Sequence, residues 1–148
     1  MNDVYGHQTG DRVLTSAVAA IRAAVCRGDL IFRYGGDEIV VIVPDEAAEN
    51  VAKLAERICT ILRTTPVETE VGGSIQLTVS IGGALYPATC GEGSHWADLF
   101  GFADEAMYAV KRRGGDGVEL AKRKDEVNFE AENRPDRDAG LSAELTTA

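Results

Sequence analysis

The alternation of hydrophobic and polar residues predicts a helix and a hairpin in the first third of the chain. Between Asp11 and Arg27 apolar residues recur at steps of three and four, which predicts an amphipathic helix that ends near Gly28. Its inward face is expected to hold Leu14, Ala17, Val18, Ile21, Ala24 and Val25. LIFRY and IVVIV then flank a glycine-containing turn, which predicts a β-hairpin. Because IVVIV is apolar at every position, we expect a central strand covered on both faces, with helices flanking the sheet.

A second helix and a second hairpin are predicted from Asp45 onward. Asp45 is the expected N-cap of a helix with a clear apolar side. That side comprises Val51, Leu54, Ile58, Ile61 and Leu62. Gly72 and Gly73 separate VETEV from SIQLTVSIG, and a double glycine can adopt the positive φ angles of a tight hairpin turn.

A third helix and a last strand complete the predicted fold. Ser94 is the expected N-cap of this helix. Its inward stripe would comprise Leu99, Ala103, Ala106, Met107 and Val110. The cations at 111–113 suit the negative end of the helix dipole, and Gly114 and Gly115 stop the helix before the short strand GVELA.

The carboxyl-terminal segment differs from the rest of the chain. From Lys122 onward the sequence is polar and almost without periodicity, so burial cannot offset the entropy lost on ordering. We therefore predict one folded domain over residues 1–121 and a disordered polar tail over residues 122–148. The alternative is a linker or weak helix that joins another segment, which Pro135 would break.

Composition narrows the class of protein. With 148 residues, 45% hydrophobic and 26% charged, the chain resembles one ordinary globular domain. Its 24 acidic residues outnumber its 15 basic ones, and the net charge of -9 opposes binding to nucleic acid. No apolar run could span a bilayer and no secretory signal is visible, so we expect a cytoplasmic segment without membrane contact. Cys26, Cys59 and Cys90 lie far apart and are expected to be reduced thiols.

The turn Gly35-Gly36-Asp37-Glu38 is the main candidate for chemistry. Two glycines let backbone N–H groups approach a phosphate, and a neighbouring carboxylate can hold a cation such as Mg²⁺ that bridges the same phosphate. Taken alone, these four residues are also compatible with an ordinary turn, because glycine and acidic residues are common turn formers.

Three further segments extend this pattern. N-D-x-Y-G-H-x-x-G-D begins at Asn2, T-V-S-I-G begins at Thr78, and A-D-x-A-M-Y-x-x-K ends at Lys111. Together with the G-G-D-E turn they resemble the GGDEF family of diguanylate cyclases, from Asn2 to about Val118. The resemblance implies an α+β fold similar to the palm of nucleotidyl cyclases and polymerases, with a mostly antiparallel central sheet flanked by helices.

The resemblance also implies an activity. Members of the family join two GTP molecules into cyclic di-GMP and release pyrophosphate, in bacterial second-messenger signalling. Each subunit binds one GTP, so a homodimer is required, and two Mg²⁺ ions stabilise the attacking and leaving oxygens. An N-terminal sensory or regulatory domain is the expected partner in the full-length protein.

Site residues follow from the positions that match the family motif. Asn2 and Asp11 are similar to the guanine readers, because an amide and a carboxylate can pair with the edge of the base. The alternative for Asp11 is a helix cap. His7 is an expected substrate contact, with a structural role in a loop as its alternative. Gly35 and Gly36 are expected to contact the substrate through their backbone.

The acidic turn and the third helix supply the remaining candidates. Asp37 corresponds to the family's metal ligand and proton acceptor, and Glu38 to the second catalytic acid. Lys111 matches a lysine that contacts the triphosphate, although a solvated lysine at a helix end is the alternative. Met107 and Tyr108 continue the inward stripe and are expected to pack in the core.

Several positions depart from the family pattern. The family normally begins earlier, with a helix and then a strand of the form apolar-Asp-apolar-Asp-x-Phe-Lys, so we interpret the chain as lacking that first helix and strand. The missing strand would carry another metal-binding aspartate, and Asp37 remains as the one clear carboxylate. Ile39 replaces a phenylalanine, and Gly115 stands where a phosphate-binding arginine is usual. We therefore expect no turnover by this chain alone, with a degenerate module that binds nucleotide or protein, or an inactive gene fragment, as alternatives.

An inhibitory cyclic di-GMP site is not expected. Many family members carry R-x-x-D five residues before the glycine turn, where this chain has Cys26-Arg27-Gly28-Asp29. The aspartate fits that pattern, but the arginine stands one place late.

Overall fold

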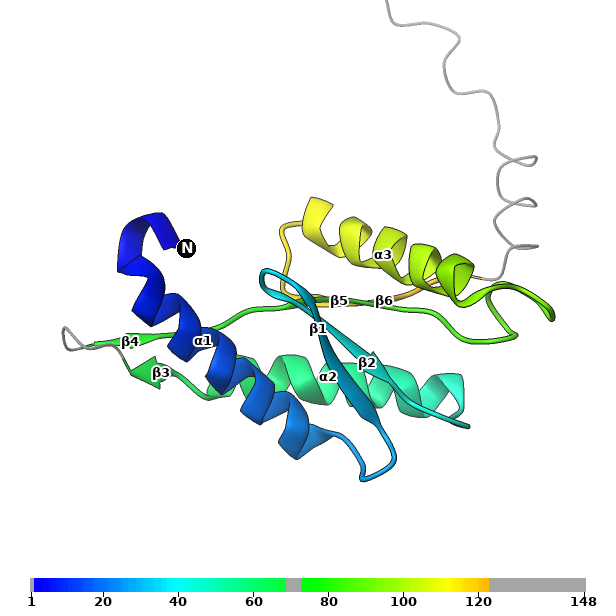
Figure 1. Cartoon of the computed structure of the whole chain (residues 1–148), viewed down its shortest axis with the longest axis horizontal. Helices are drawn as coiled ribbons and strands as arrows, with labels where there is room; N and C mark the ends of the chain where they lie inside the picture. Colours follow the sequence, from blue (N-terminus) through cyan, green and yellow to red (C-terminus); the bar gives the residue numbers. More distant parts are fainter. Residues whose placement is uncertain (1, 69–72, 123–148) are drawn as a thin grey trace, which may run out of the picture.

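The structure is a computed structural model that describes residues 2–68 and 73–122. Along these residues each helix is followed by one or more short strands (Figure 1). In chain order the elements are α1 (Asn2–Ala24), β1 (Leu30–Gly35), β2 (Glu38–Ile42), α2 (Ala48–Thr64), β3 (Val67–Glu68), β4 (Ser74–Ile75), β5 (Ser80–Gly83), α3 (Trp96–Arg112) and β6 (Gly117–Leu120). The predicted tail lies outside the described residues, apart from Lys122. Within them, no helix is long and apolar enough to cross a lipid bilayer.

Helix α1 begins earlier than the hydrophobic pattern predicts. It starts at Asn2 rather than at Asp11, and it ends at Ala24. Gly6 and Gly10 lie within its first turns, and glycine lowers helix propensity, so the pattern alone could not place this start. The predicted inward face is confirmed in part, because Ile21 and Ala24 are buried. Val13, which is not on the predicted face, is buried as well, whereas Leu14 and Val18 are only half-buried.

The first hairpin forms as predicted, but its second strand is not a covered central strand. β1 and β2 pair in antiparallel register, with Phe32 opposite Val40. Among the described residues β2 is hydrogen-bonded to β1 alone. Ile42 is 48% exposed, so the prediction that both faces are covered is wrong. Ile31, Ile39 and Val41 on one face of the hairpin pack on the core, whereas Phe32 and Ile42 are about half exposed.

β5 and β6 form a separate, parallel pair of strands. β5 and β6 are hydrogen-bonded in parallel, with Ile81 opposite Val118. The connection between them is α3, because parallel neighbours need a crossover and a hairpin turn cannot supply one. Helix α3 packs closely against β5 at Gly82, where an added Cβ would lie 2.0 Å from the Ala103 carbonyl oxygen. The sheet expected from the sequence is thus divided into separate two-stranded pairs in the described part of the chain.

The second hairpin is shorter than predicted. β3 and β4 pair in antiparallel register, with Val67 opposite Ile75. Its turn, including Gly72, lies outside the described residues. The segment SIQLTVSIG forms two separate strands, β4 and β5, because its second half turns away to pair with β6.

Neither predicted N-cap is used. Helix α2 starts after Ala47, and Asp45 adopts a positive φ of 52°. The Glu46 carboxylate instead accepts hydrogen bonds from the Ala47 backbone N–H and the Asn50 side-chain amide. The hydrogen bond from Asn50 is the main cause that lowers the pKa of Glu46. These bonds hold the segment just before α2, whereas no side chain of the described residues caps the backbone N–H groups of the first turn itself.

Helix α3 is capped by His95 and Asp98. The Asp98 carboxylate accepts a hydrogen bond of 3.0 Å from the His95 backbone N–H. The Ser94 hydroxyl donates to the Cys90 carbonyl instead, at 2.7 Å. Acidic Asp98 in the first turn also suits the positive end of the helix dipole. Ser94 thus belongs to the preceding loop and not to the helix cap.

The core lies between α1, α2 and the strands. Its buried members are Val13, Ile21, Ala24, Ile58, Leu62, Val67 and Leu77. The Arg57 guanidinium of α2 donates to the Ala24 carbonyl at the end of α1, which ties the two helices together.

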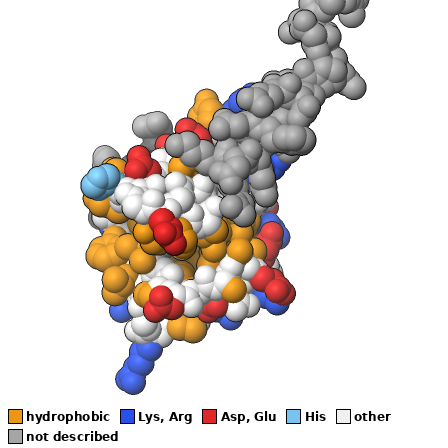
Figure 2. Space-filling model, turned by 90° about the vertical axis from the view of Figure 1, so that its right-hand side faces the viewer, with side chains coloured by type: hydrophobic (Ala, Val, Ile, Leu, Met, Phe, Trp, Pro, Cys, Tyr) orange, Lys and Arg blue, Asp and Glu red, His pale blue; other side chains and the backbone are white. Residues whose placement is uncertain are grey.

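Burial is the main cause that raises the pKa of the Cys59 thiol, while Cys26 is exposed. Figure 2 shows hydrophobic side chains that lie open at the surface between acidic ones on the face it presents.

Candidate active site

The glycine turn sits at the exposed end of the first hairpin. Gly35 opposes Glu38 across the turn, and the register shifts between Arg33 and Gly35. Gly36 has a φ of +45°, in the region that side chains other than glycine rarely adopt. An added Cβ at Gly35 or Gly36 would meet nothing within 4 Å. The backbone of this turn is therefore open to a ligand.

Arg33 fixes the shape of the turn. Its Nε and Nη2 atoms donate to the Gly36 carbonyl oxygen at 3.0 and 2.8 Å. A guanidinium presents donors in a fixed fork, so this pair of bonds restrains the turn. Sequence reasoning missed this residue. Its position shortly before the glycines, on a strand otherwise apolar or aromatic, was the available signal.

The two acidic residues of the turn are accessible. Asp37 lies in the turn itself and Glu38 begins β2, and both are exposed. Within the described residues neither carboxylate forms an ion pair or a side-chain hydrogen bond, so both can accept a cation or a proton. No group of three or more His, Cys, Asp or Glu side chains in that part of the chain could hold a metal ion together. Asp37 and Glu38 thus fit Mg²⁺ as ligands, but only as part of a coordination shell.

Asp11 lies in the middle of α1, so the alternative of a helix cap is wrong. Its side chain is exposed, and its carbonyl oxygen accepts a hydrogen bond from the Thr15 hydroxyl at 2.8 Å. Asn2 and His7 also lie in α1 rather than in a loop, since the helix starts at Asn2. The structure does not describe the side chains of residues 2–9, so their roles stay predictions.

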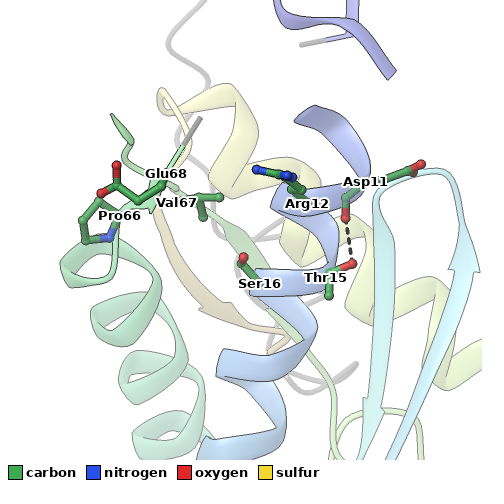
Figure 3. Close-up of a pocket in the computed structure, with 7 residues that line it drawn as sticks. All are labelled: Asp11, Arg12, Thr15, Ser16, Pro66, Val67 and Glu68. Carbon is green, nitrogen blue, oxygen red and sulfur yellow. Dashed lines mark hydrogen bonds between the residues drawn. The ribbon is translucent and has the colours of Figure 1, made fainter. Parts of the chain in front are cut away.

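A groove of about 440 Å³ runs between α1 and β3 (Figure 3). Its lining includes Arg12 and Ser16 of α1 together with Val67 and Glu68 of β3. In Figure 3 the Asp11 carboxylate points away from β3 and toward the side where the first hairpin lies. The groove and the glycine turn are therefore on different sides of α1.

Lys111 lies in the last turn of α3 and is exposed. No ion pair with Lys111 forms among the described residues, which leaves its ammonium group open to an anion. In Figure 1 the end of α3 and the hairpin turn lie near the upper middle, and the first half of α1 lies to the left of them. Tyr108 is 61% exposed, so the prediction that it packs in the core is wrong. It follows half-buried Met107 by one residue, which turns its side chain toward solvent.

The loop after α3 has a shape that suits glycine. Gly114 and Gly115 have φ angles of 108° and 79°, and Asp116 follows at 53°. The Arg63 guanidinium of α2 holds the Asp116 carboxylate through bonds of 3.0 and 2.9 Å. The hydrogen bond to Asp116 is the main cause that raises the pKa of Arg63. The position where the family usually has an arginine is thus a glycine with positive φ in this chain.

Asp29, which fits the aspartate of the R-x-x-D pattern, is hydrogen-bonded within the turn that follows α1. The Asp29 carboxylate accepts a hydrogen bond of 2.7 Å from the Cys26 backbone N–H. The Asp29 N–H in turn donates to the Cys26 carbonyl at 3.2 Å. This local pairing occupies one oxygen of the Asp29 carboxylate.

Comparison with known proteins places these motifs in one family. Residues 1–117 match the family model described as diguanylate cyclase, GGDEF domain. Diguanylate cyclase DosC of Escherichia coli is 36% identical over 122 residues, which are 82% of this chain and 26% of DosC. The GGDEF domain of PA1120 (TpbB or YfiN) from Pseudomonas aeruginosa has a TM-score of 0.75 at 32% identity and covers 87% of this chain, which covers 73% of it. The GGDEF domain of DgcB from Caulobacter crescentus, solved with c-di-GMP, has a TM-score of 0.73 at 33% identity, over 81% of this chain and 69% of that one.

The chain therefore belongs to the GGDEF family of diguanylate cyclases. The predicted α+β palm-like fold is confirmed by these structural neighbours. The chain spans about a quarter of the length of the curated relatives it matches. The family match therefore concerns this domain and not the remaining length of those relatives.

Proposed function

We propose that this domain binds GTP and Mg²⁺ and, facing a second copy, condenses two GTP molecules into cyclic di-GMP with release of pyrophosphate. The observation that carries the proposal is the open glycine turn, in which Asp37 and Glu38 are exposed and unpaired within the described residues. The family match over residues 1–117 includes this turn. The product would serve as a second messenger in bacteria.

Different elements would hold different parts of the nucleotide. Asn2 and Asp11 of α1 would pair with the guanine edge, with His7 as a further contact. Backbone N–H groups of Gly35 and Gly36 would contact the phosphates, because no Cβ obstructs their approach. Lys111 of α3 would place its ammonium charge on the triphosphate.

Asp37 and Glu38 would carry the chemistry. Bound Mg²⁺ would neutralise charge on the attacking and leaving oxygens, and both carboxylates are ligands of the type it prefers. Asp37 would accept the proton of the GTP 3′-hydroxyl as that oxygen attacks the α-phosphate of the GTP on the facing subunit. The bond from the α-phosphorus to the bridging oxygen breaks, and pyrophosphate leaves. Because each subunit presents one GTP, the reaction needs a homodimer.

Turnover is expected to depend on carboxylates beyond this turn. The sequence contains no apolar-Asp-apolar-Asp motif, and no cluster of three metal-ligating side chains occurs among the described residues. We therefore predict that this chain, given GTP and Mg²⁺, forms no detectable cyclic di-GMP in a chromatographic assay. A chimera in which a helix and an apolar-Asp-apolar-Asp strand of the family pattern precede Met1 should form the product.

The control for this assay is Asp37→Ala in the same chimera, which should form no product. Product formation by the 148-residue chain that Asp37→Ala removes would contradict the expected lack of turnover. An inactive chimera would instead favour a degenerate module that binds nucleotide or a protein partner. Two observations motivate that alternative. Ile39, at the position of the family phenylalanine, packs against the core, and Gly115 leaves its loop without the usual cation.

A further inference from the structure

The hairpin that carries the glycine turn is held to the rest of the fold by side chains. β1 and β2 pair with each other, but neither strand lies closely alongside any other helix or strand of the described chain. Ile31, Ile39 and Val41 pack on the core from one face of the hairpin. Phe32, which points to the opposite face, is 49% exposed. The position of the turn therefore depends on a small number of side-chain contacts.

One of these contacts lies directly beside the turn. Tyr34 immediately precedes Gly35, and its ring lies 4.7 Å from the ring of Phe100, tilted by 41°. Phe100 also meets Trp96 edge-on at 6.4 Å. Both separations fall within the range of favourable aromatic pairs. A row of three aromatic rings thus joins the end of β1 to the first turns of α3.

Helix α3 provides a firm anchor for this row. At Gly82 the backbone of β5 approaches the helix so closely that no side chain fits between them. Ala106 and Val110 on the same helix are buried. Phe100 is consequently attached to a fixed element, whereas Tyr34 belongs to the loosely attached hairpin. In Figure 1 the hairpin runs across α2 in the view shown.

The same helix carries Lys111 at its other end. We propose that the contact between Tyr34 and Phe100 is a positioning element, which sets the place of the Gly35–Glu38 turn relative to Lys111. Its effect on nucleotide binding rests on the proposed function, whereas its effect on the hairpin does not. Neither Tyr34 nor Phe100 would contact a reacting atom of the substrate. They act through the turn and through α3.

Phe100→Ala tests the contact without any nucleotide. The variant should raise amide hydrogen exchange in residues 35–42 by roughly two- to tenfold, since the lost ring pair is worth that factor. Exchange in α2 should stay unchanged and serves as the internal reference. Tyr108→Ala is the matched control, because Tyr108 is an exposed aromatic residue of α3 for which no ring contact occurs among the described residues. Phe100→Tyr should restore the wild-type exchange.

Trp96 supplies a spectroscopic signature of the same contact. It is the only tryptophan of the sequence and it is 71% exposed beside Phe100. Addition of GTP with Mg²⁺ should change its fluorescence in the wild type and in Tyr108→Ala. The change should be lost in Phe100→Ala, and the apparent affinity for GTP should fall by about two- to tenfold.

The outcomes separate this inference from the proposed function. Unchanged exchange at residues 35–42 in Phe100→Ala would overturn the positioning role, whatever the nucleotide does. Faster exchange with no binding of GTP by any variant would support the positioning role and contradict the proposed function. If Phe100→Ala loses its helical circular dichroism, Tyr34→Ala removes the same contact from an exposed strand position and replaces it in both measurements.

Discussion

Gly82→Ala is expected to lower the free energy of unfolding by about 3 kcal/mol. An added Cβ would lie 2.0 Å from the Ala103 carbonyl oxygen and 2.3 Å from the Met107 amide nitrogen. Both atoms belong to the backbone of α3, so no side-chain rotation can relieve the overlap. Helix α3 would have to move away from β5, and its buried Ala106 and Val110 would lose their packing. Urea unfolding followed by circular dichroism measures the loss as a lower midpoint.

Gly101→Ala is the matched control for this experiment. Gly101 lies inside α3, and an added Cβ there would meet nothing within 4 Å. Alanine favours the helix over glycine by up to about 1 kcal/mol, so this variant should be as stable as the wild type or more stable. Equal unfolding midpoints for Gly82→Ala and the wild type would show that α3 does not rest on β5 in the way described.

Asp37→Asn is expected to weaken Mg²⁺-dependent binding of GTP by about 100-fold. Loss of a group that only supports a metal ligand already costs 10–100-fold in metal affinity, and the loss of a ligand itself should cost at least as much. Asparagine keeps the size of the side chain and removes its charge, so the hairpin should fold normally. Titration calorimetry with GTP, in the presence and absence of Mg²⁺, measures the effect. In the wild type Mg²⁺ should strengthen binding, and in Asp37→Asn it should have little influence.

Asp45→Asn provides the control for charge. Asp45 is an exposed carboxylate beyond the other end of β2, and its positive φ of 52° is one that asparagine tolerates. This variant should bind GTP as the wild type does. Equal losses in the two variants would indicate a general effect of net charge, and no loss in Asp37→Asn would remove Asp37 from the metal site.

The sequence predicted the elements better than their pairing. Helices α2 and α3 carry clear apolar stripes, and Ile58, Leu62 and Val110 are buried as expected. The first hairpin is also local, because its strands are joined by a short turn with glycine at a positive φ. The parallel pairing of β5 with β6 joins segments separated by the whole of α3, and a periodic pattern contains no information on which distant strand will be the neighbour. The same reason explains why SIQLTVSIG divides into two strands.

The sequence likewise predicted only part of the candidate site. The motif identified Asp37 and Lys111 as residues of interest, and both are exposed in the structure. It did not reveal the two bonds from Arg33 to the Gly36 carbonyl or the contact between Tyr34 and Phe100. Those interactions depend on where side chains point after folding. They hold the shape and place of the turn, which a list of motif residues does not contain.

In the proposed function the glycine turn, Asp11 and Lys111 belong to one site for GTP and a divalent cation. Mn²⁺ accepts the same carboxylate and phosphate oxygens as Mg²⁺, and its unpaired electrons broaden NMR signals of nearby amides. Addition of Mn²⁺ with GTP to the labelled chain should broaden residues 35–38 most, together with amides around Asp11 and the end of α3, and should leave the middle of α2 sharp. Broadening centred on another part of the chain, with residues 35–38 unaffected, would show that the glycine turn does not hold the cation.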